Sequence, residues 1–338
     1  MSVLIIENAG PATSVQDGGR YGAQRYGLPP SGAMDRLSLA AANSLVGNTP
    51  FAGAIEIGPL GLAFRFQDGP ARIAVAGALR TITINGKIAP MCETVMIADG
   101  EAVKIGPARD GVFSYLAMEG GIVGETEFGS VSVNARAGLG SPYPRVLSSQ
   151  DQLHVGTAQP AAYERCLDIP LLSNEPIRVV LGPQDDEFGS SVELFLRSQW
   201  QVSAMSDRMG YRLDGPRITH AHGHNIVSDG TVNGSIQVPG SGQPIILMPD
   251  RGTTGGYPKI ATVISADLGR LAQMQAGRTI RFAAVCVKSA QTELLKMQTI
   301  LRALPSRIRP AGSSYLNIDE LQKANVAGVA VDAMRTDT

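Results

Sequence analysis

The sequence predicts a mainly β protein made of two β-barrel or β-sandwich domains, with a few short helices and a helical C-terminal tail. Short apolar runs separated by Gly, Asn or Asp turns follow one another from Ile55 and again from Ile177, as is typical of strands in such domains. The 39 glycines and the aromatic content of 5% suit tight turns between short strands. Segments about 180 residues apart resemble each other, which indicates a duplicated β domain.

The N-terminal part is predicted to contain a strand, a glycine-rich loop and a helix. Residues 3–7 are the apolar strand, and the loop over 10–22 mixes hydroxyls, an amide, a carboxylate and a cation. Asp35 is a typical N-cap for a helix over 36–46, and Gly47 is the expected stop. The first turn of this helix could bind an anion, or the helix could only plug one end of a barrel.

The rest of the first half is predicted to be strands joined by turns. Asn85 and Gly86 stand between two β-branched runs and predict a hairpin over 82–87. Residues 125–145 are rich in Gly, Ser and Pro and predict a mobile loop, and residues 151–155 return to the strand pattern.

The second half begins after a segment with three prolines, 158–176, which is the best linker candidate. Strands are expected at 177–181 and from 208 to 285. A short helix is expected over 187–197, because its apolar residues share one side.

The C-terminal tail is predicted to be helical. Residues 291–304 carry leucine and methionine at helical spacing, and Pro305 ends this helix. A weaker helix is expected around 318–324. The tail could pack against the body or bind a partner. The predicted domains are a first barrel with its N-terminal loop and helix, a second barrel, and the tail, at residues 1–160, 175–285 and 286–338.

Three pairs of segments carry the internal repeat. They are residues 25–28 with 208–211, residues 54–57 with 235–238, and the strands that follow Gly100 and Gly277.

Composition excludes several classes of function. The net charge of −1 gives no basic surplus for nucleic acid or for an anionic membrane surface. No apolar segment reaches 18 residues, so no membrane span is expected. The three cysteines are far apart and form no CxxC pair, and the N-terminus has no basic start for a signal peptide. These features predict a cytoplasmic protein with reduced thiols.

Familiar catalytic signatures are missing from the sequence. It contains no GxxxxGK[ST] loop for ATP, no GxGxxG after a strand, no GxSxG elbow and no HExxH. His220, His222 and His224 would share one face of a strand, but no acidic or cysteine ligand accompanies them closely and Gly223 favours a loop. No metal site is therefore predicted.

Two polar, glycine-rich loops remain as candidates for a site. The second loop, 250–259, has three glycines among charged and hydroxyl side chains, which suits close approach of an anionic or amide-bearing small molecule. A plain hairpin with a solvated tip is the alternative. Small-molecule sites often lie between domains, so we expect the two loops to meet in a cleft. The candidate side chains are Gln16, Asp17 and Arg20 from the first loop and Asp250, Arg251, Thr254, Tyr257 and Lys259 from the second.

An ordered set of motifs resembles the biotin-dependent carboxyltransferase family, which includes the allophanate hydrolase subunit 2 proteins. The motifs are GPATSVQDGGR (10–20), PSGAMD (30–35), LVGN (45–48), SDRMGYRL (206–213), IQVP (236–239) and TTGGYPK (253–259). Three departures are visible. Val131 stands where family members usually carry an arginine, and Gly252 stands where a glutamine commonly precedes the threonines. The segment GLGSPYPRVL (138–147) replaces the glycine-rich GG-x-GR-x-L region of the family.

The resemblance implies a fold of two cyclophilin-like β-barrels. It also implies a companion protein, similar to allophanate hydrolase subunit 1 or to the B subunit of 5-oxoprolinase, and a third protein similar to the A subunit of that enzyme. Such complexes use ATP to open 5-oxoproline to glutamate. In the urea carboxylase context, the equivalent module helps to move a carboxyl group from carboxybiotin to an amide nitrogen. A further hypothesis is that the chain is a regulatory protein that binds its partner and has no catalytic activity of its own.

The motifs suggest which residues act in such a site. Catalytic roles are expected for Asp17, Arg20, Tyr257 and Lys259. Substrate-binding roles are expected for Gln16, Asp35, Asn48, Gln237, Asp250, Arg251 and Thr254.

Overall fold

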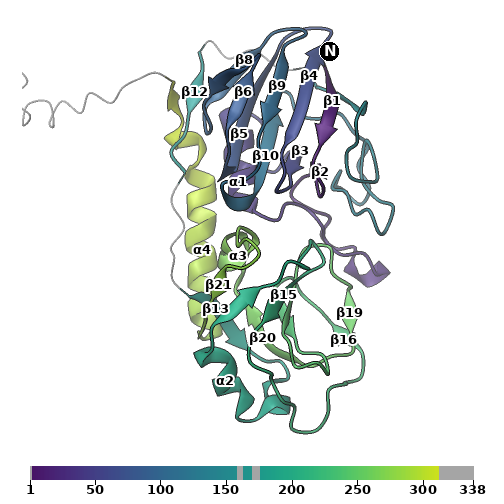
Figure 1. Ribbon diagram of the computed structural model, residues 1–338, viewed down its shortest axis with the longest axis vertical. Coiled ribbons are helices and arrows are strands. Elements are labelled where there is room, and N and C mark those ends of the chain that lie inside the picture. Colours follow the sequence, from purple (N-terminus) through teal and green to yellow (C-terminus); the bar gives the residue numbers. More distant parts are fainter. Residues whose placement is uncertain (1, 158–162, 170–175, 312–338) are drawn as a thin grey trace, which may run out of the picture.

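The computed structural model describes residues 2–157, 163–169 and 176–311. Two β domains stand one above the other, and a long helix runs along one side of both (Figure 1). The mainly β fold class is therefore confirmed. Within the described residues, no helix is long and apolar enough to cross a membrane.

The first domain is built from two facing sheets. Its six-stranded sheet has the order β11 (Gln152–His154), β1 (Val3–Ala9), β4 (Leu62–Gln67), β9 (Ala102–Ile105), β6 (Ile82–Ile84) and β7 (Lys87–Ala89). Its five-stranded sheet has the order β2 (Ser14–Gln16), β3 (Ala54–Ile57), β10 (Asp110–Met118), β5 (Ala71–Leu79) and β8 (Thr94–Ile97). Alternate apolar side chains of both sheets, such as Phe64 and Ile73, fill the space between them.

The second domain wraps one eight-stranded sheet around buried apolar side chains such as Ile236 and Ile246. The order is β21 (Thr279–Ile280), β14 (Trp200–Val202), β15 (Gly210–Asp214), β18 (Ile245–Leu247), β17 (Ser235–Gln237), β20 (Lys259–Val263), β13 (Ile177–Leu181) and β22 (Phe282–Ala284). A separate two-stranded ribbon pairs β16 (Asp229–Gly230) with β19 (Thr254–Gly255). Short helices complete the domain, namely η2 (Asp185–Phe188), α2 (Ser191–Arg197), η3 (Ser265–Asp267) and α3 (Leu268–Ala272).

The helix α1 (Arg36–Leu45) joins the two domains through its packing. It lies on β5 and β10 of the first domain, and Leu39, Ala42 and Leu45 are fully buried. These residues belong to one continuous apolar cluster that also contains Trp200 and Phe195 of the second domain. The domains therefore share a core, and the position of α1 sets how they meet.

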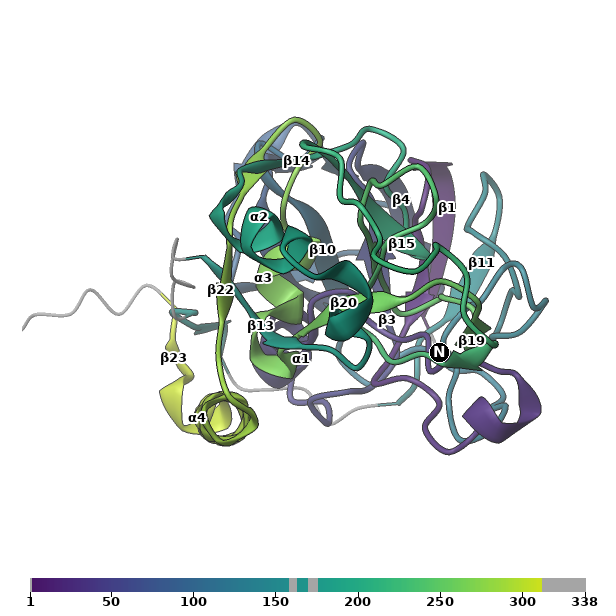
Figure 2. The same ribbon diagram turned by 90° about the horizontal axis from the view of Figure 1, so that it is seen from below.

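The long helix α4 (Val287–Ala303) returns the chain from the second domain to the first. Viewed along its axis in Figure 2, α4 stands beside the second domain, and none of its residues is fully buried. Glu293 ties it to Arg178 of β13 by an ion pair of 2.8 Å. After η4 (Pro305–Arg307), the strand β23 (Arg309–Pro310) pairs with β12 (Arg165–Cys166), whose neighbour Glu164 contacts Arg72 of the first domain.

Several predicted elements are confirmed. Asp35 caps α1 by accepting hydrogen bonds from the amides of Leu37 and Ser38. The hairpin of β6 and β7 turns at Asn85 and Gly86, whose φ values of 48° and 82° match a type I′ turn.

Other predictions are corrected or lie outside the described residues. The helix expected over 187–197 is split into η2 and α2, because Gly189 adopts a non-helical conformation between them. The helix expected over 291–304 begins earlier, at Val287. The helix around 318–324 and most of the linker over 158–176 fall outside the described residues. The domain boundaries stay predictions.

The internal repeat agrees with the structure at two of its three pairs. Residues 54–57 and 235–238 both fall on strands, β3 and β17, and Gly100 and Gly277 both turn the chain before strands, β9 and β21. The third pair does not match in structure. Residues 25–28 overlap the short helix η1 (Gln24–Tyr26), whereas residues 208–211 lead into β15.

Candidate active site

Asp17 organises the first polar loop. Its carboxylate accepts hydrogen bonds from the Gly19 amide (2.7 Å), the Val131 amide (2.8 Å) and the hydroxyls of Ser130 (2.7 Å) and Ser132 (2.5 Å). These bonds hold the segment around Val131 against the loop, although residues 125–145 were expected to be a mobile loop. A carboxylate that accepts from this many donors is a strong local anchor.

Arg20 and Gln16 lie buried behind Asp17. Arg20 is 1% exposed and donates through Nη2 to the Ser132 carbonyl, while its Nε and Nη1 have no partner. Burial lowers the pKa of Arg20, and the nearby charges of Asp17, Glu127 and Asp250 oppose this. Gln16 donates to Ser14 Oγ and to the Val133 carbonyl, and its Oε1 has no partner. The loop thus encloses polar groups whose hydrogen-bonding capacity is partly unused.

A buried hydrogen-bond chain connects the second domain to the first. Asp250 accepts from Arg208 (2.8 Å), and Arg208 also pairs with Glu56 of β3 (2.5 Å). Glu56 in turn accepts from the hydroxyl of Tyr115 (2.7 Å), and that hydroxyl accepts from the Asp35 amide (2.7 Å). Asp250 is therefore occupied by a contact between the domains.

Both carboxylate oxygens of Asp35 also accept hydrogen bonds from within the protein. Besides capping α1, its Oδ2 accepts from Ser38 Oγ (2.7 Å) and from Gln273 Nε2 (2.9 Å). Gln273 follows α3 of the second domain, so the cap of α1 is completed from across the domain junction.

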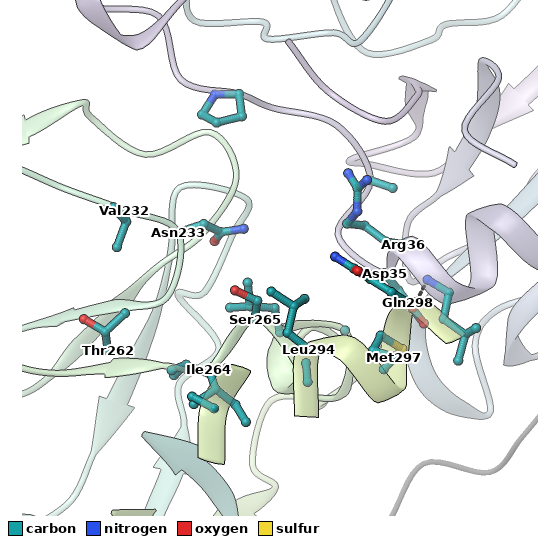
Figure 3. Close-up of a pocket in the computed structure, with 18 of the residues that line it drawn as sticks. Asp35, Arg36, Val232, Asn233, Thr262, Ile264, Ser265, Leu294, Met297 and Gln298 are labelled. Carbon is teal, nitrogen blue, oxygen red and sulfur yellow. Dashed lines mark hydrogen bonds between the residues drawn. The ribbon is translucent and has the colours of Figure 1, made fainter. Parts of the chain in front are cut away.

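A cavity of about 920 Å³ lies between the two domains and α4. Figure 3 shows Val232 and Asn233 of the second domain facing Asp35 and Arg36 of the first, with Leu294 on a third side. One part of the lining is polar and the part that α4 supplies is largely apolar. This is the usual make-up of a small-molecule site.

Arg251 contributes an unbalanced charge to the lining of this cavity. It is 2% exposed and donates through Nη2 to Gln24 Oε1 and to the Thr231 carbonyl, both at 3.3 Å. Its Nε and Nη1 have no partner, and neither has the buried Oδ1 of Asn233. Burial lowers the pKa of Arg251 to about 10, so the guanidinium is still charged at neutral pH.

Arg36 places a second cation at the rim. Its Nη1 donates to the Gly18 carbonyl (2.5 Å) and to Tyr21 Oη (3.1 Å), and its guanidinium lies 4.2 Å from the centre of the Phe51 ring. The two arginines make this side of the cavity attractive to an anion.

Lys259 belongs to a different polar group inside the second domain. Its side chain is 3% exposed, and Nζ donates to Asp229 Oδ2 at 2.7 Å. Gln184 also reaches Asp229 (3.3 Å) and accepts from the Lys259 amide (3.1 Å). Hydrogen bonds from Lys259 and the Gly230 amide lower the pKa of Asp229.

The remaining residues expected from the second loop surround this Lys259 group. Gln237 pairs with Lys259 between β17 and β20, and it packs so closely on Gly255 that a Cβ there would lie 2.3 Å from its Nε2. Tyr257 is 40% exposed, and Thr254 lies exposed on β19. The structure therefore brings the first loop together with Asp250 and Arg251, whereas the Lys259 side chain is bonded to Asp229.

Asn48 and the histidines lie elsewhere. Asn48 binds Asn43 Oδ1, the Met118 carbonyl and the Gly120 amide at the C-terminal end of α1. His220, His222 and His224 lie on a loop, as Gly223 indicated. Among the residues that the structure describes, no group of three or more His, Cys, Asp or Glu is arranged to hold a metal.

Sequence reasoning missed the residues that connect the domains. Glu56 is the only charged residue of the buried strand β3, and such a residue signals a buried partner. That partner, Arg208, lies in another domain, and the motif over 206–213 that contains it did not indicate which residue it contacts. No sequence pattern indicated Asn233 and Gln24, because their importance comes only from their position in the lining of the cavity.

Comparisons with known proteins agree with this architecture. The family model for the carboxyltransferase domain, subdomain A and B, matches residues 26–284. The chain is 38% identical over 294 residues to the C subunit of 5-oxoprolinase from Escherichia coli (strain K12), covering 85% of this chain and 93% of that protein. It is 37% identical over 279 residues to the C subunit of 5-oxoprolinase from Haemophilus influenzae, covering 82% and 89%.

A solved structure is also similar. The crystal structure of the K. lactis urea amidolyase superposes with a TM-score of 0.83 at 28% identity. The superposition covers 91% of this chain and only 21% of that much longer chain.

Proposed function

Since this chain belongs to the family of the carboxyltransferase domain, subdomain A and B, we propose that it is one component of an ATP-dependent, 5-oxoprolinase-type hydrolase. The complex would open 5-oxoproline to glutamate together with two further proteins, which resemble the B and A subunits of 5-oxoprolinase. The three free thiols suit a reducing compartment, and we place the complex in the cytoplasm.

The observation that carries this proposal is a polar cavity in a chain that matches the C subunit of 5-oxoprolinase over most of both lengths. The substrate carries one carboxylate and one cyclic amide. The cavity offers Arg251 and Arg36 for the acid, and Asn233 for an amide. These groups match the two polar ends of 5-oxoproline.

The chemistry needs activation of an amide. Transfer of the ATP γ-phosphoryl group to the lactam oxygen makes the ring carbon electrophilic. Water then adds to that carbon and the C–N bond breaks, which leaves an acyl phosphate with a free amine; a second water releases phosphate and glutamate. ATP is assigned to the complex as a whole, since no P-loop motif occurs in this sequence.

Within this proposal, Arg20, Asp35, Asp250 and Arg251 act at the domain junction. Arg251 binds substrate directly, whereas Asp35 and Asp250 hold the walls in place. Catalytic roles for Asp17, Arg20, Tyr257 and Lys259, and binding roles for Gln16, Asn48, Gln237 and Thr254, are retained as proposals for the assembled complex.

A carboxyltransferase component is the second candidate. The observation that favours it is the TM-score of 0.83 with the urea amidolyase structure. In that case the cavity would receive carboxybiotin as a substrate delivered by a separate carrier, and an amide nitrogen would accept the carboxyl group.

One reconstitution separates these functions. The chain is co-purified with its B-type companion, and glutamate formation from 5-oxoproline is measured with the A-type protein and ATP. Turnover that requires all three proteins is the expected result. Transfer of carboxyl from carboxybiotin without glutamate formation would favour the second candidate. A tight complex with neither activity would overturn both and leave a non-catalytic binding protein.

A further inference from the structure

The cavity between the domains contains a buried cation without a counter-charge. Arg251 is 2% exposed, and two of its nitrogens, Nε and Nη1, have no hydrogen-bond partner. Among the described residues, no carboxylate forms an ion pair with it, and its two Nη2 contacts are neutral oxygens at 3.3 Å. Burying a charge in this way is costly unless a ligand compensates it.

A free carboxamide lies close to that cation. Asn233 follows Thr231, whose carbonyl is a contact of Arg251, by two residues. Its Oδ1 is buried without a partner, and its nitrogen points towards the middle of the cavity (Figure 3). An amide with both groups unused can pair with the N–H and C=O of another amide.

A third wall of the cavity is apolar and comes from α4. Leu294 and Met297 face the cavity (Figure 3), and Ile264 extends the same surface. The volume of about 920 Å³ greatly exceeds what a five-membered ring needs. The cavity therefore has room for carbon atoms beyond the two polar groups of a ligand.

We propose that this cavity binds small monocarboxylates that also carry an amide and an apolar segment. The carboxylate is bound by the guanidinium of Arg251, which lines the cavity, the amide pairs with Asn233, and the apolar segment lies along Leu294 and Met297. Arg251 is the buried cation of the cavity, whereas Arg36 lies at the rim and already donates to Gly18 and Tyr21. One guanidinium that is not otherwise paired suits one carboxylate better than a doubly charged phosphate. The inference rests on the proposed function only in placing 5-oxoproline, a small cyclic member of this class, in the same cavity.

Binding to the purified full-length chain is measured by calorimetry with a defined series. The series consists of 5-oxoproline, N-acetylglycine, N-butanoylglycine and N-hexanoylglycine. Affinity is expected to rise about fourfold per added methylene that becomes buried, which corresponds to about 0.8 kcal/mol. The neutral N-hexanoylglycinamide and inorganic phosphate are expected to bind at least about tenfold more weakly.

Two matched pairs of variants locate the contacts. Arg251→Gln is expected to weaken N-hexanoylglycine by about 10- to 100-fold, while the exposed Arg302→Gln leaves it unchanged. Leu294→Asn is expected to flatten the dependence on chain length, whereas Leu295→Asn, at a residue that is 63% exposed on the same helix, does not. N-hexanoylsarcosine, which lacks the amide N–H, is expected to bind more weakly than N-hexanoylglycine.

A thermal melt excludes a merely structural role for Arg251. Because the guanidinium has no counter-charge, Arg251→Gln is expected to keep or raise the melting temperature. Equal affinity of the acids for the Arg251→Gln variant and the unaltered chain would overturn the inference, even if the reconstituted complex turns over 5-oxoproline. Conversely, the expected binding pattern without turnover would leave the inference standing and refute the proposed function.

Discussion

Arg208 Nη1 lies 2.5 Å from Glu56 Oε1, and the two side chains come from different domains. Arg208 is also bonded to Asp250 and to the Gly32 carbonyl, and Glu56 is fully buried. This contact therefore fixes β3 of the first domain against the loop before β15 of the second. It lies next to the cavity without lining it, so its expected role is to set the distance between the cavity walls.

Removing the cation of this pair should destabilise the protein. Arg208→Met leaves Glu56 and Asp250 without their common partner, and the free energy of unfolding is expected to fall by about 3–5 kcal/mol. Urea titration followed by circular dichroism measures this change. The exposed pair of Arg65 and Glu7 is the control, because Arg65→Met should cost at most about 1 kcal/mol. Equal losses in the two variants would contradict the assigned role.

The ion pair of Asp267 with Arg178, which also pairs with Glu293 of α4, should be sensitive to acid. Burial alone would raise the pKa of Asp267, but hydrogen bonds from Arg178 and the charge of Arg270 outweigh it and hold the pKa below its ordinary value. A depressed folded-state pKa contributes stability above the unfolded pKa of about 3.9, and this is lost as pH falls through the folded-state value.

Asp267→Asn tests this dependence. The difference in unfolding free energy between the unaltered chain and the variant should be largest at pH 7 and shrink steadily below about pH 4. Urea titrations at pH 7, 5, 4 and 3 give the comparison. A difference that stays constant down to pH 3 would show that Asp267 does not carry the acid sensitivity.

The three thiols should react at different rates. Hydrogen bonds from Ser289 lower the pKa of Cys286, which is exposed, whereas burial raises the pKa of Cys92 to about 11. With iodoacetamide at pH 8, Cys286 should be modified at least about tenfold faster than Cys92, because the thiolate is the reactive form. Peptide mass spectrometry measures both rates. In 8 M urea the two rates should converge; a preference that persists there would point to local sequence instead of the fold.

Asp17 is expected to act as an anchor of the loop. Asn in its place cannot accept all four hydrogen bonds, so Asp17→Asn should cost about 2–4 kcal/mol and free the segment around Ser130. Limited proteolysis between residues 125 and 145 should become faster. If the variant is stable and uncut but inactive in the reconstituted complex, Asp17 is a catalytic group instead of an anchor.

Lys259 gives the complementary test inside the second domain. Lys259→Met keeps most of the side-chain volume but removes the contact with Asp229. If Lys259 serves catalysis, turnover of 5-oxoproline by the complex should fall by about 100-fold or more while the complex still assembles. Lys296→Met, on the exposed face of α4, is the control and should leave turnover unchanged. Unaltered turnover in Lys259→Met would make the Asp229 contact purely structural.

Local features of the fold could be predicted from the sequence because their causes lie within a few residues. Asp35 with the helix that follows it is one case, and the turn at Asn85 and Gly86 is another. The candidate site was harder to predict, since it depends on contacts between segments that are distant in the sequence. Lys259 was expected at an exposed, polar tip, yet Asp229 and Gln184 enclose it. Arg251 was selected for its loop, but its unpaired nitrogens depend on which neighbours the second domain brings to it.

The return of the chain through α4 has a consequence for synthesis. β12 leaves the ribosome before the second domain, but its partner β23 comes after it. β12 thus lacks its partner strand during translation until the last described strand arrives. The pairing of β23 with β12 closes a ring that consists of both domains and α4. The rate of this pairing depends on α4 already having its full length. A chain that stops before Arg309 lacks the partner of β12 and cannot make this pairing.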